Sequence, residues 1–152
     1  MDLGNYYNYW KKYRDEVKLV TSIHNVDIFD LNETMNYVKN QGKGPHLVVE
    51  DPSVRSGGNS VDNVVEVAVA AILVIDKLHI RKDKAKDRNQ LLIDTFEIAK
   101  QIKIQMLADA EEGCTMLRGL QYRRFELDKV GPLSDSLYGW RLQFEYHTPL
   151  NS

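Results

Sequence analysis

The sequence predicts an α+β domain in which about four strands form a mixed or antiparallel sheet, with a long helix on one sheet face and further helices at the N-terminus. Three observations predict it: a long β-branched stretch at 61–80, an amphipathic stretch at 84–112, and strict alternation at 140–147. A chain of 152 residues fits one domain with a single core. We expect a helical N-terminal part, 1–44, and a sheet-and-helix core, 45–148.

The stretch 61–80 predicts the central strand. Eight of its first sixteen residues are β-branched, Gly and Pro are absent, and Glu66 is the one charge between Asp62 and Asp76. Period-two alternation places one apolar set on the face expected to meet the core: Val65, Val67, Val69, Ala71, Leu73 and Ile75. The opposite face is small enough to meet a helix or another subunit: Val64, Glu66, Ala68, Ala70, Ile72 and Val74.

Two helices are predicted before the sheet. The first spans about 5–21 and carries an apolar stripe of Tyr6, Trp10, Tyr13, Val17 and Val20. We expect this stripe to pack on the protein's own body, the alternatives being an aromatic arm for a neighbouring subunit and an interfacial membrane helix. The second begins at Asp30, whose spacing to Glu33 predicts a capping box.

A strand, a loop and the central strand follow. The Gly42–Pro45 turn precedes the strand His46–Glu50, which Asp51-Pro52 ends. The segment Ser53–Ser60 is expected to be a flexible loop, so that the two flanking strands form an antiparallel pair with a projecting connection. Its Gly57-Gly58 pair lacks the rest of a phosphate-binding P-loop.

The long helix is predicted over about 84–112, where apolar residues recur at three- and four-residue steps and Gly113 follows the last turn. The basic run Arg81–Arg88 at its start has two interpretations, a solvated connection or a patch that contacts phosphates or a partner. A solvated connection is the usual interpretation of such a run.

Two strands close the domain. The strand 119–130 alternates imperfectly, which predicts a bulge near Arg123-Arg124. The last strand places Trp140, Leu142, Phe144 and Tyr146 on an inner face, and Arg141, Gln143, Glu145 and His147 on an outer one. The connection 131–139 is longer than a tight turn requires, which indicates a contact role.

The charged and reactive residues form no recognisable catalytic or metal-binding pattern. Twenty Lys and Arg against 22 Asp and Glu argue against a dedicated nucleic-acid binder, and the longest uncharged apolar run, Val67–Ile75, is too short to cross a bilayer. The single Cys114 cannot form an internal disulfide, and the four histidines lack the spacing of a metal site. We therefore expect no enzyme activity, cofactor or metal, and a chain that is soluble when made.

One catalytic alternative stays open. Glu50, Asp51 and Glu66 end or begin adjacent strands, as do the acids that hold Mg²⁺ in nucleases of the restriction-enzyme type. Those enzymes place a Lys two residues after the second-strand Glu, where this chain has Ala68. A second alternative is a small intracellular adaptor or ligand-binding domain.

The order of elements from His46 to Tyr146, ending in YGWRLQFEY, resembles the tail terminator and head-to-tail joining proteins of long-tailed bacteriophages. That resemblance implies a non-enzymatic virion subunit, assembled in the host cytoplasm, that forms a homo-oligomeric ring, commonly a hexamer. Its partners would be the tail tube and the head connector, with nucleic acid at most transient in a lumen and no membrane contact.

Two loops are the candidate partner contacts. A ring needs two different, complementary patches on each subunit, and polar loops can become ordered on contact. We expect both loops to project toward the tube or lumen, and the candidate residues are Arg55, Ser56, Gly57, Gly58 and Asn59 in the first, and Leu133, Ser134, Asp135, Ser136 and Leu137 in the second.

Overall fold

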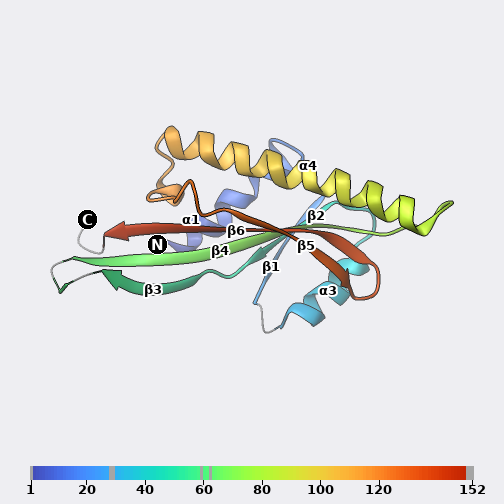
Figure 1. Cartoon of the computed structure of the whole chain (residues 1–152), viewed down its shortest axis with the longest axis horizontal. Helices are drawn as coiled ribbons and strands as arrows, with labels where there is room; N and C mark the ends of the chain where they lie inside the picture. Colours follow the sequence, from blue (N-terminus) through green and yellow to red (C-terminus); the bar gives the residue numbers. More distant parts are fainter. Residues whose placement is uncertain (1, 28–29, 59, 62, 150–152) are drawn as a thin grey trace.

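The computed structural model describes residues 2–27, 30–58, 60–61 and 63–149 (Figure 1). Six strands form one mixed sheet in the order β1-β2-β4-β6-β5, and β3 also pairs with β4. The strands are β1 (Ser22–Val26), β2 (His46–Glu50), β3 (Ser53–Gly58), β4 (Val64–Lys77), β5 (Glu126–Leu133) and β6 (Leu137–Pro149). The helices are α1 (Leu3–Trp10), α2 (Lys12–Asp15), α3 (Leu31–Lys39) and α4 (Lys84–Glu111). The predicted α+β class is confirmed.

Strand β4 is the centre of the sheet, as its β-branched sequence predicts. One edge pairs with β6 from Val65 to Lys77, and the other pairs with β2 near its end and with β3 near its start. The backbones of β4 and β6 approach closely at Gly139, where an added Cβ would lie 1.9 Å from the Val74 carbonyl oxygen. Only glycine fits there.

The main core lies on the face of β4 that was expected to meet a helix or another subunit, and the occupants are this chain's own helices. Ala68, Ala70, Ile72 and Val74 pack there against helix α4 and the N-terminal aromatic rings. The small alanines let the helices approach, and three fully buried rings fill the remaining space: Tyr6, Trp10 and Tyr13. The prediction that the other face of β4 takes the core is therefore wrong for most of its length.

A second, smaller core lies on the opposite sheet face. Leu73 and Ile75 pack there with Val48 of β2 and with Met35 and Val38 of α3. Figure 1 shows α3 on the other side of the sheet from α4, beneath one end only. The side of β4 that carries Val65, Val67 and Val69 lies beyond this helix.

The N-terminal segment differs from its predicted form while keeping its predicted packing. Its stripe does pack on the protein's own body, but the helical part ends at Asp15 rather than near Thr21. Lys18 takes a positive φ of 56°, and the N–H groups of Leu19 and Val20 turn back to the Tyr13 carbonyl oxygen. The chain then enters β1, a parallel neighbour of β2 that was expected to be only a link. Asp30 makes no side-chain cap, so the predicted capping box is absent.

The segment predicted as a loop at Ser53–Ser60 is mostly a strand. β3 runs antiparallel to β4 from Ser53 to Gly58, continuing the direction of β2 after the break at Asp51-Pro52. The prediction that β2 and β4 pair antiparallel is correct. However, β3 occupies most of the segment that was expected to be the loop between them. Asn59, the last candidate residue of this segment, lies outside the described residues.

The two closing strands are also rearranged. Leu120 forms an isolated bridge to Tyr146, and β5 begins only at Glu126, so a turn at 121–124 replaces the predicted bulge. The register shift lies instead between Val130 and Leu133. The connection to β6 is reduced to residues 134–136, which makes it a tight turn. Helix α4 matches its prediction, with Asp83 as N-cap and Gly113 at a φ of 85°.

Candidate interaction surface

The most exposed part of the sheet is an arm made of β3, the first half of β4 and the end of β6. In Figure 1 these strands extend past the helices at the end opposite α3. Every residue of β3 is exposed except Gly57, which is half-buried. Val54 is 48% exposed, and Val61, just beyond the strand, is 90% exposed. Exposed valines on a projecting strand favour a contact surface over a solvated loop.

One face of the arm, here called the outer face, combines an apolar row with a charged row. Residue pairing places Val67 beside His147 and Val69 beside Glu145 across β4 and β6. Arg55 of β3 lies opposite Val67 and so belongs to the same face. The polar outer face predicted for the last strand is thus confirmed as a row of partly buried side chains on β6.

The charged row is held by side-chain contacts rather than left free. Arg141 donates from Nε to Glu50 at 2.9 Å and from Nη1 to Gln143 at 2.9 Å. Further along β6, His147 hydrogen-bonds Glu145, and Arg124 lies 3.5 Å from the same carboxylate. The hydrogen bond from His147, assisted by the Arg124 charge, holds the pKa of Glu145 below its ordinary value. These contacts fix the charged side chains of β6 against one another and against Glu50 and Arg124.

Three strands have an open edge within the described part of the chain. There β1 pairs with β2 alone, β3 with β4 alone and β5 with β6 alone, so each has one edge of unpaired backbone groups. The β1 and β3 edges lie on one side of the sheet and the β5 edge lies on the other. Unpaired edges are templates for adding a strand from another chain.

The second candidate loop, 133–137, is not free. Leu137 is fully buried in the second core, and Ser134 donates to Asn36 of α3 at 2.8 Å. The turn lies at the α3 end of the sheet, whereas Arg55, Ser56, Gly57 and Gly58 lie on the arm. Arg55 to Gly58 pair with Val67 to Val64 of β4 and Leu137 pairs with Lys77, so roughly 33–43 Å of strand separates the two segments. They therefore lie at opposite ends of the sheet.

The fold brings together two histidines that no sequence motif linked. The parallel pairing of β1 and β2 places Ser22 between His24 and His46, whose ring centres lie 5.9 Å apart. His46 also hydrogen-bonds the Gly42 carbonyl oxygen at 3.3 Å. Because β1 is short and polar, no sequence pattern indicated the strand that joins these residues.

The acids considered for a magnesium site do not converge. Glu50 lies on the outer face in an ion pair with Arg141, whereas Glu66 lies on the core face of β4. Asp51 accepts a hydrogen bond from the Tyr7 hydroxyl. Over residues 2–27, 30–58, 60–61 and 63–149, no group of three or more His, Cys, Asp or Glu is arranged to hold a metal ion.

No family model matches this chain, and no curated protein matches it. In the described residues, each helix is too short or too polar to span a bilayer.

Proposed function

We propose that this chain is a structural subunit that assembles with copies of itself into a ring, as its resemblance to phage tail terminator and head-to-tail joining proteins implies. The observation that supports the proposal is that open edges lie on opposite sides of the sheet, among them β3 on one side and β5 on the other. Two different edges give a heterologous contact, which is the kind that builds rings. In this role the subunit belongs to a virion and caps the tail or joins it to the head connector.

The two edges have compatible geometry. β3 runs antiparallel to β4, β4 to β6, and β6 to β5, so β3 and β5 also run antiparallel to each other. A neighbouring copy that adds its β5 to β3 would therefore continue the sheet in one antiparallel direction. It would also keep the outer faces of both copies on the same side.

The side chains on the two edges are complementary. Arg55 of β3 and the exposed acids Glu126 and Asp128 of β5 lie on the outer face. On the opposite face, the exposed Val54 would lie near Leu127 of the next copy. A basic and an apolar residue on one edge thus meet an acidic and an apolar residue on the other, which selects a neighbouring copy as the partner.

The test is a charge exchange across this contact. Sedimentation velocity and negative-stain microscopy should show rings for the wild-type chain and monomers for both Arg55→Glu and Asp128→Arg, because each puts like charges together. The double variant should form rings again, since it restores an opposite-charge pair. Arg123→Glu, an exposed change outside both edges, is the control and should assemble normally.

A wild-type chain that stays monomeric at its highest attainable concentration, also in the presence of tail tubes, contradicts the ring proposal. If rings form but neither single variant disrupts them, the ring stands and the contact between β3 and β5 is wrong.

A further inference from the structure

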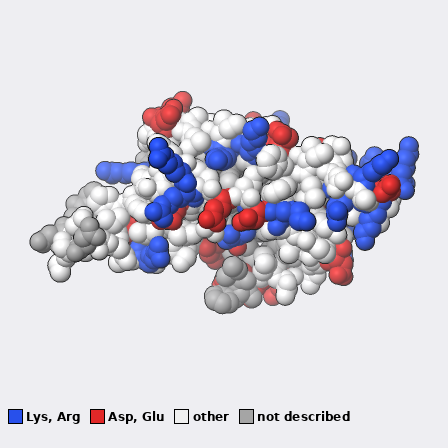
Figure 2. Space-filling model, in the orientation of Figure 1, with Lys and Arg blue, Asp and Glu red and all other residues white. Residues whose placement is uncertain are grey.

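A second surface, distinct from the arm, gathers positive charge where β4 passes into α4. Figure 2 shows Lys and Arg side chains concentrated at that end of the molecule. We call it the basic end. It comprises Lys39, Lys43, Lys77, His79, Arg81, Lys82, Lys84, Lys86 and Arg88. These residues come from three segments: the end of α3, the turn before β2, and the passage from β4 into α4.

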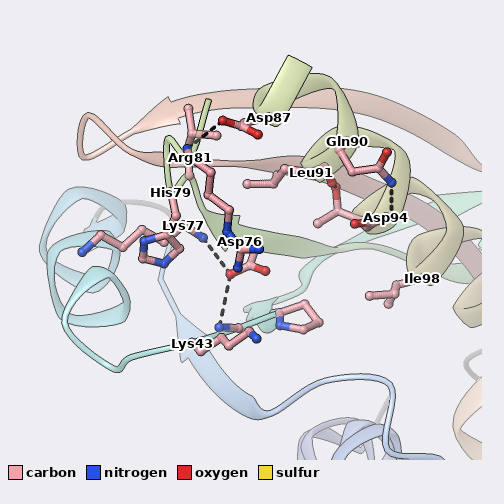
Figure 3. Close-up of a pocket in the computed structure, with 14 residues that line it drawn as sticks. Lys43, Asp76, Lys77, His79, Arg81, Asp87, Gln90, Leu91, Asp94 and Ile98 are labelled. Carbon is pink, nitrogen blue, oxygen red and sulfur yellow. Dashed lines mark hydrogen bonds between the residues drawn. The ribbon is translucent and has the colours of Figure 1, made fainter. Parts of the chain in front are cut away.

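A hollow of about 460 Å³ lies at the centre of the basic end. Its lining consists of Gly42 and five basic side chains, with no acid among them: Lys39, Lys43, Lys77, His79 and Arg81. An adjoining hollow of about 400 Å³ shares four of these residues and reaches the first turns of α4 (Figure 3). Four of the five basic groups therefore face both hollows.

The acids of this region accept hydrogen bonds, three of them from backbone N–H groups and Asp94 from the Gln90 side chain. Asp76 accepts from the N–H groups of Gly44 and Lys77, at 3.2 and 2.8 Å, as the dashed lines in Figure 3 show. Asp87 accepts from the N–H groups of Arg81 and Lys82, and these bonds lower its pKa. Asp83 caps α4 through Ala85 and Lys86.

The ion pairs of the described residues lie elsewhere, on α2, α4, β2, β6 and the turn before β5. At the basic end the carboxylates shape the loop, and the basic residues are exposed except for Lys39 and Lys77, which are half-buried.

The charge is strongly asymmetric as a result. Eight Lys and Arg face four Asp at this end, in a chain whose formal net charge is −2. A local positive field of this kind attracts polyanions even when the whole molecule is acidic. The net charge, from which we expected no dedicated nucleic-acid binder, does not reveal this local asymmetry.

The array is longer than a single anion requires. The helical part alone, from Lys84 to Arg88, advances about 6 Å, and the hollow extends the array further. Phosphates of one DNA strand follow each other at about 3.4 Å along the helix axis. Several consecutive phosphates can therefore contact the array at once. Apart from the His79 imidazole, the side chains of the array carry no ring on which a base could stack, so contact with the backbone is favoured over recognition of bases.

We propose that the basic end binds the sugar–phosphate backbone of a nucleic acid without sequence preference. The proposal rests on this local charge and does not require ring assembly. Within a ring, it would give each subunit one contact with nucleic acid that passes through or along the assembly.

The test is fluorescence anisotropy of the full chain with short labelled DNA duplexes of unrelated sequence, over a series of salt concentrations. The variant carries Lys43→Gln, Arg81→Gln and Lys84→Gln, all exposed positions. Its matched control carries Lys100→Gln, Arg118→Gln and Arg123→Gln, which are also exposed, lie outside the basic end and change the net charge equally. Circular dichroism verifies that both remain folded.

The expected result is binding that is insensitive to sequence and at least about tenfold weaker in the variant than in the control. The plot of log binding constant against log salt concentration should also be less steep for the variant, its negative slope being smaller in magnitude by about 3, since three phosphate contacts are lost. Equal weakening in variant and control would overturn the proposal, as would no measurable binding at low salt. Polyglutamate that competes as well as DNA would overturn it too, because the basic end would then fit an acidic protein surface.

Discussion

At the residue scale, the cluster of Ser22, His24 and His46 has an assigned set of donors and acceptors. The Gly42 carbonyl oxygen can only accept, so His46 donates to it from Nε2 and accepts the Ser22 hydroxyl proton at Nδ1. His24 then donates from Nε2 to the Ser22 oxygen at 2.9 Å.

The cluster predicts a loss of stability on acidification. Burial lowers the pKa of His24 below its ordinary value, and the nearby His46 lowers it further by a smaller amount. The acids Asp30 and Glu33 line the same hollow and favour the protonated form, but they do not reverse this shift. The unfolded chain therefore takes up a proton below about pH 6.5 that the folded chain resists, so the contribution of His24 to stability is constant above that pH and decreases as the pH falls below it. Urea unfolding at several pH values should show a smaller fall for His24→Gln than for the wild type.

The matched control for this titration is His79→Gln, which removes an exposed histidine. It should keep the wild-type dependence on pH. An identical fall in the wild type and in His24→Gln would show that other groups cause the effect.

At the element scale, the N-terminal helices are part of the core and not an arm for a neighbouring subunit. The Trp10 ring is fully buried, lies 5.8 Å from Tyr13 in a stacked arrangement, and contacts Phe144 of β6 with ring centres 5.7 Å apart. Tyr9 and Lys12 both bond Asp109 near the end of α4. Helices α1 and α2 are thereby fixed to the sheet and to α4 together.

Truncating this aromatic contact should be costly. Trp10→Ala leaves a cavity among Tyr6, Tyr13 and Phe144, which is expected to lower the free energy of unfolding by about 3–5 kcal/mol. Leu3→Ala, on the same helix but 50% exposed, should change it by less than about 0.5 kcal/mol. Chemical denaturation followed by circular dichroism measures both. Similar small losses for the two variants would mean that α1 contributes little to the fold.

At the scale of the whole molecule, the two cores share one strand. The main core uses Ile72 and Val74 of β4, and the second core uses Leu73 and Ile75 on the opposite face. A change in either core therefore acts on the same backbone segment. This arrangement couples the α3 end of the sheet to the aromatic core.

Because of this coupling, unfolding should be a single transition. Met35→Ala in the second core should lower the free energy of unfolding by about 2–5 kcal/mol. Near-ultraviolet dichroism, dominated by the aromatic core, and far-ultraviolet dichroism should shift together in denaturant. Separate transitions in the variant, with the aromatic signal unchanged, would show instead that α3 and its core unfold on their own.

The candidate surface could be predicted only in part. Arg55–Gly58 do lie on the most exposed part of the sheet, as their Gly-rich composition indicated, but they form a strand because β4 offers six residues of free edge to pair with. Residues 133–137 are instead held against α3. The basic end was visible as a run of charges at Arg81–Arg88, whereas the contribution of Lys39 and Lys43 depends on where α3 ends in space.

The sequence by itself determined the elements whose signal is local and long. Strand β4 follows from its β-branched run, α4 from its periodic apolar residues and Gly113, and the inner face of β6 from strict alternation. Each of these patterns specifies one backbone period over many residues, so tertiary contacts have little to alter. The α+β class follows from these three elements.

Only the tertiary structure decided which face of β4 takes the main core, because both faces are apolar and the choice depends on the volume that Tyr6, Trp10 and Tyr13 supply from far along the chain. It also decided that the short segments β1 and β3 are strands, since each gains its hydrogen bonds from a neighbour that is already in place. The proximity of His24 to His46, and of Lys39 to Arg81, follows from the same long-range pairing, which no local pattern encodes.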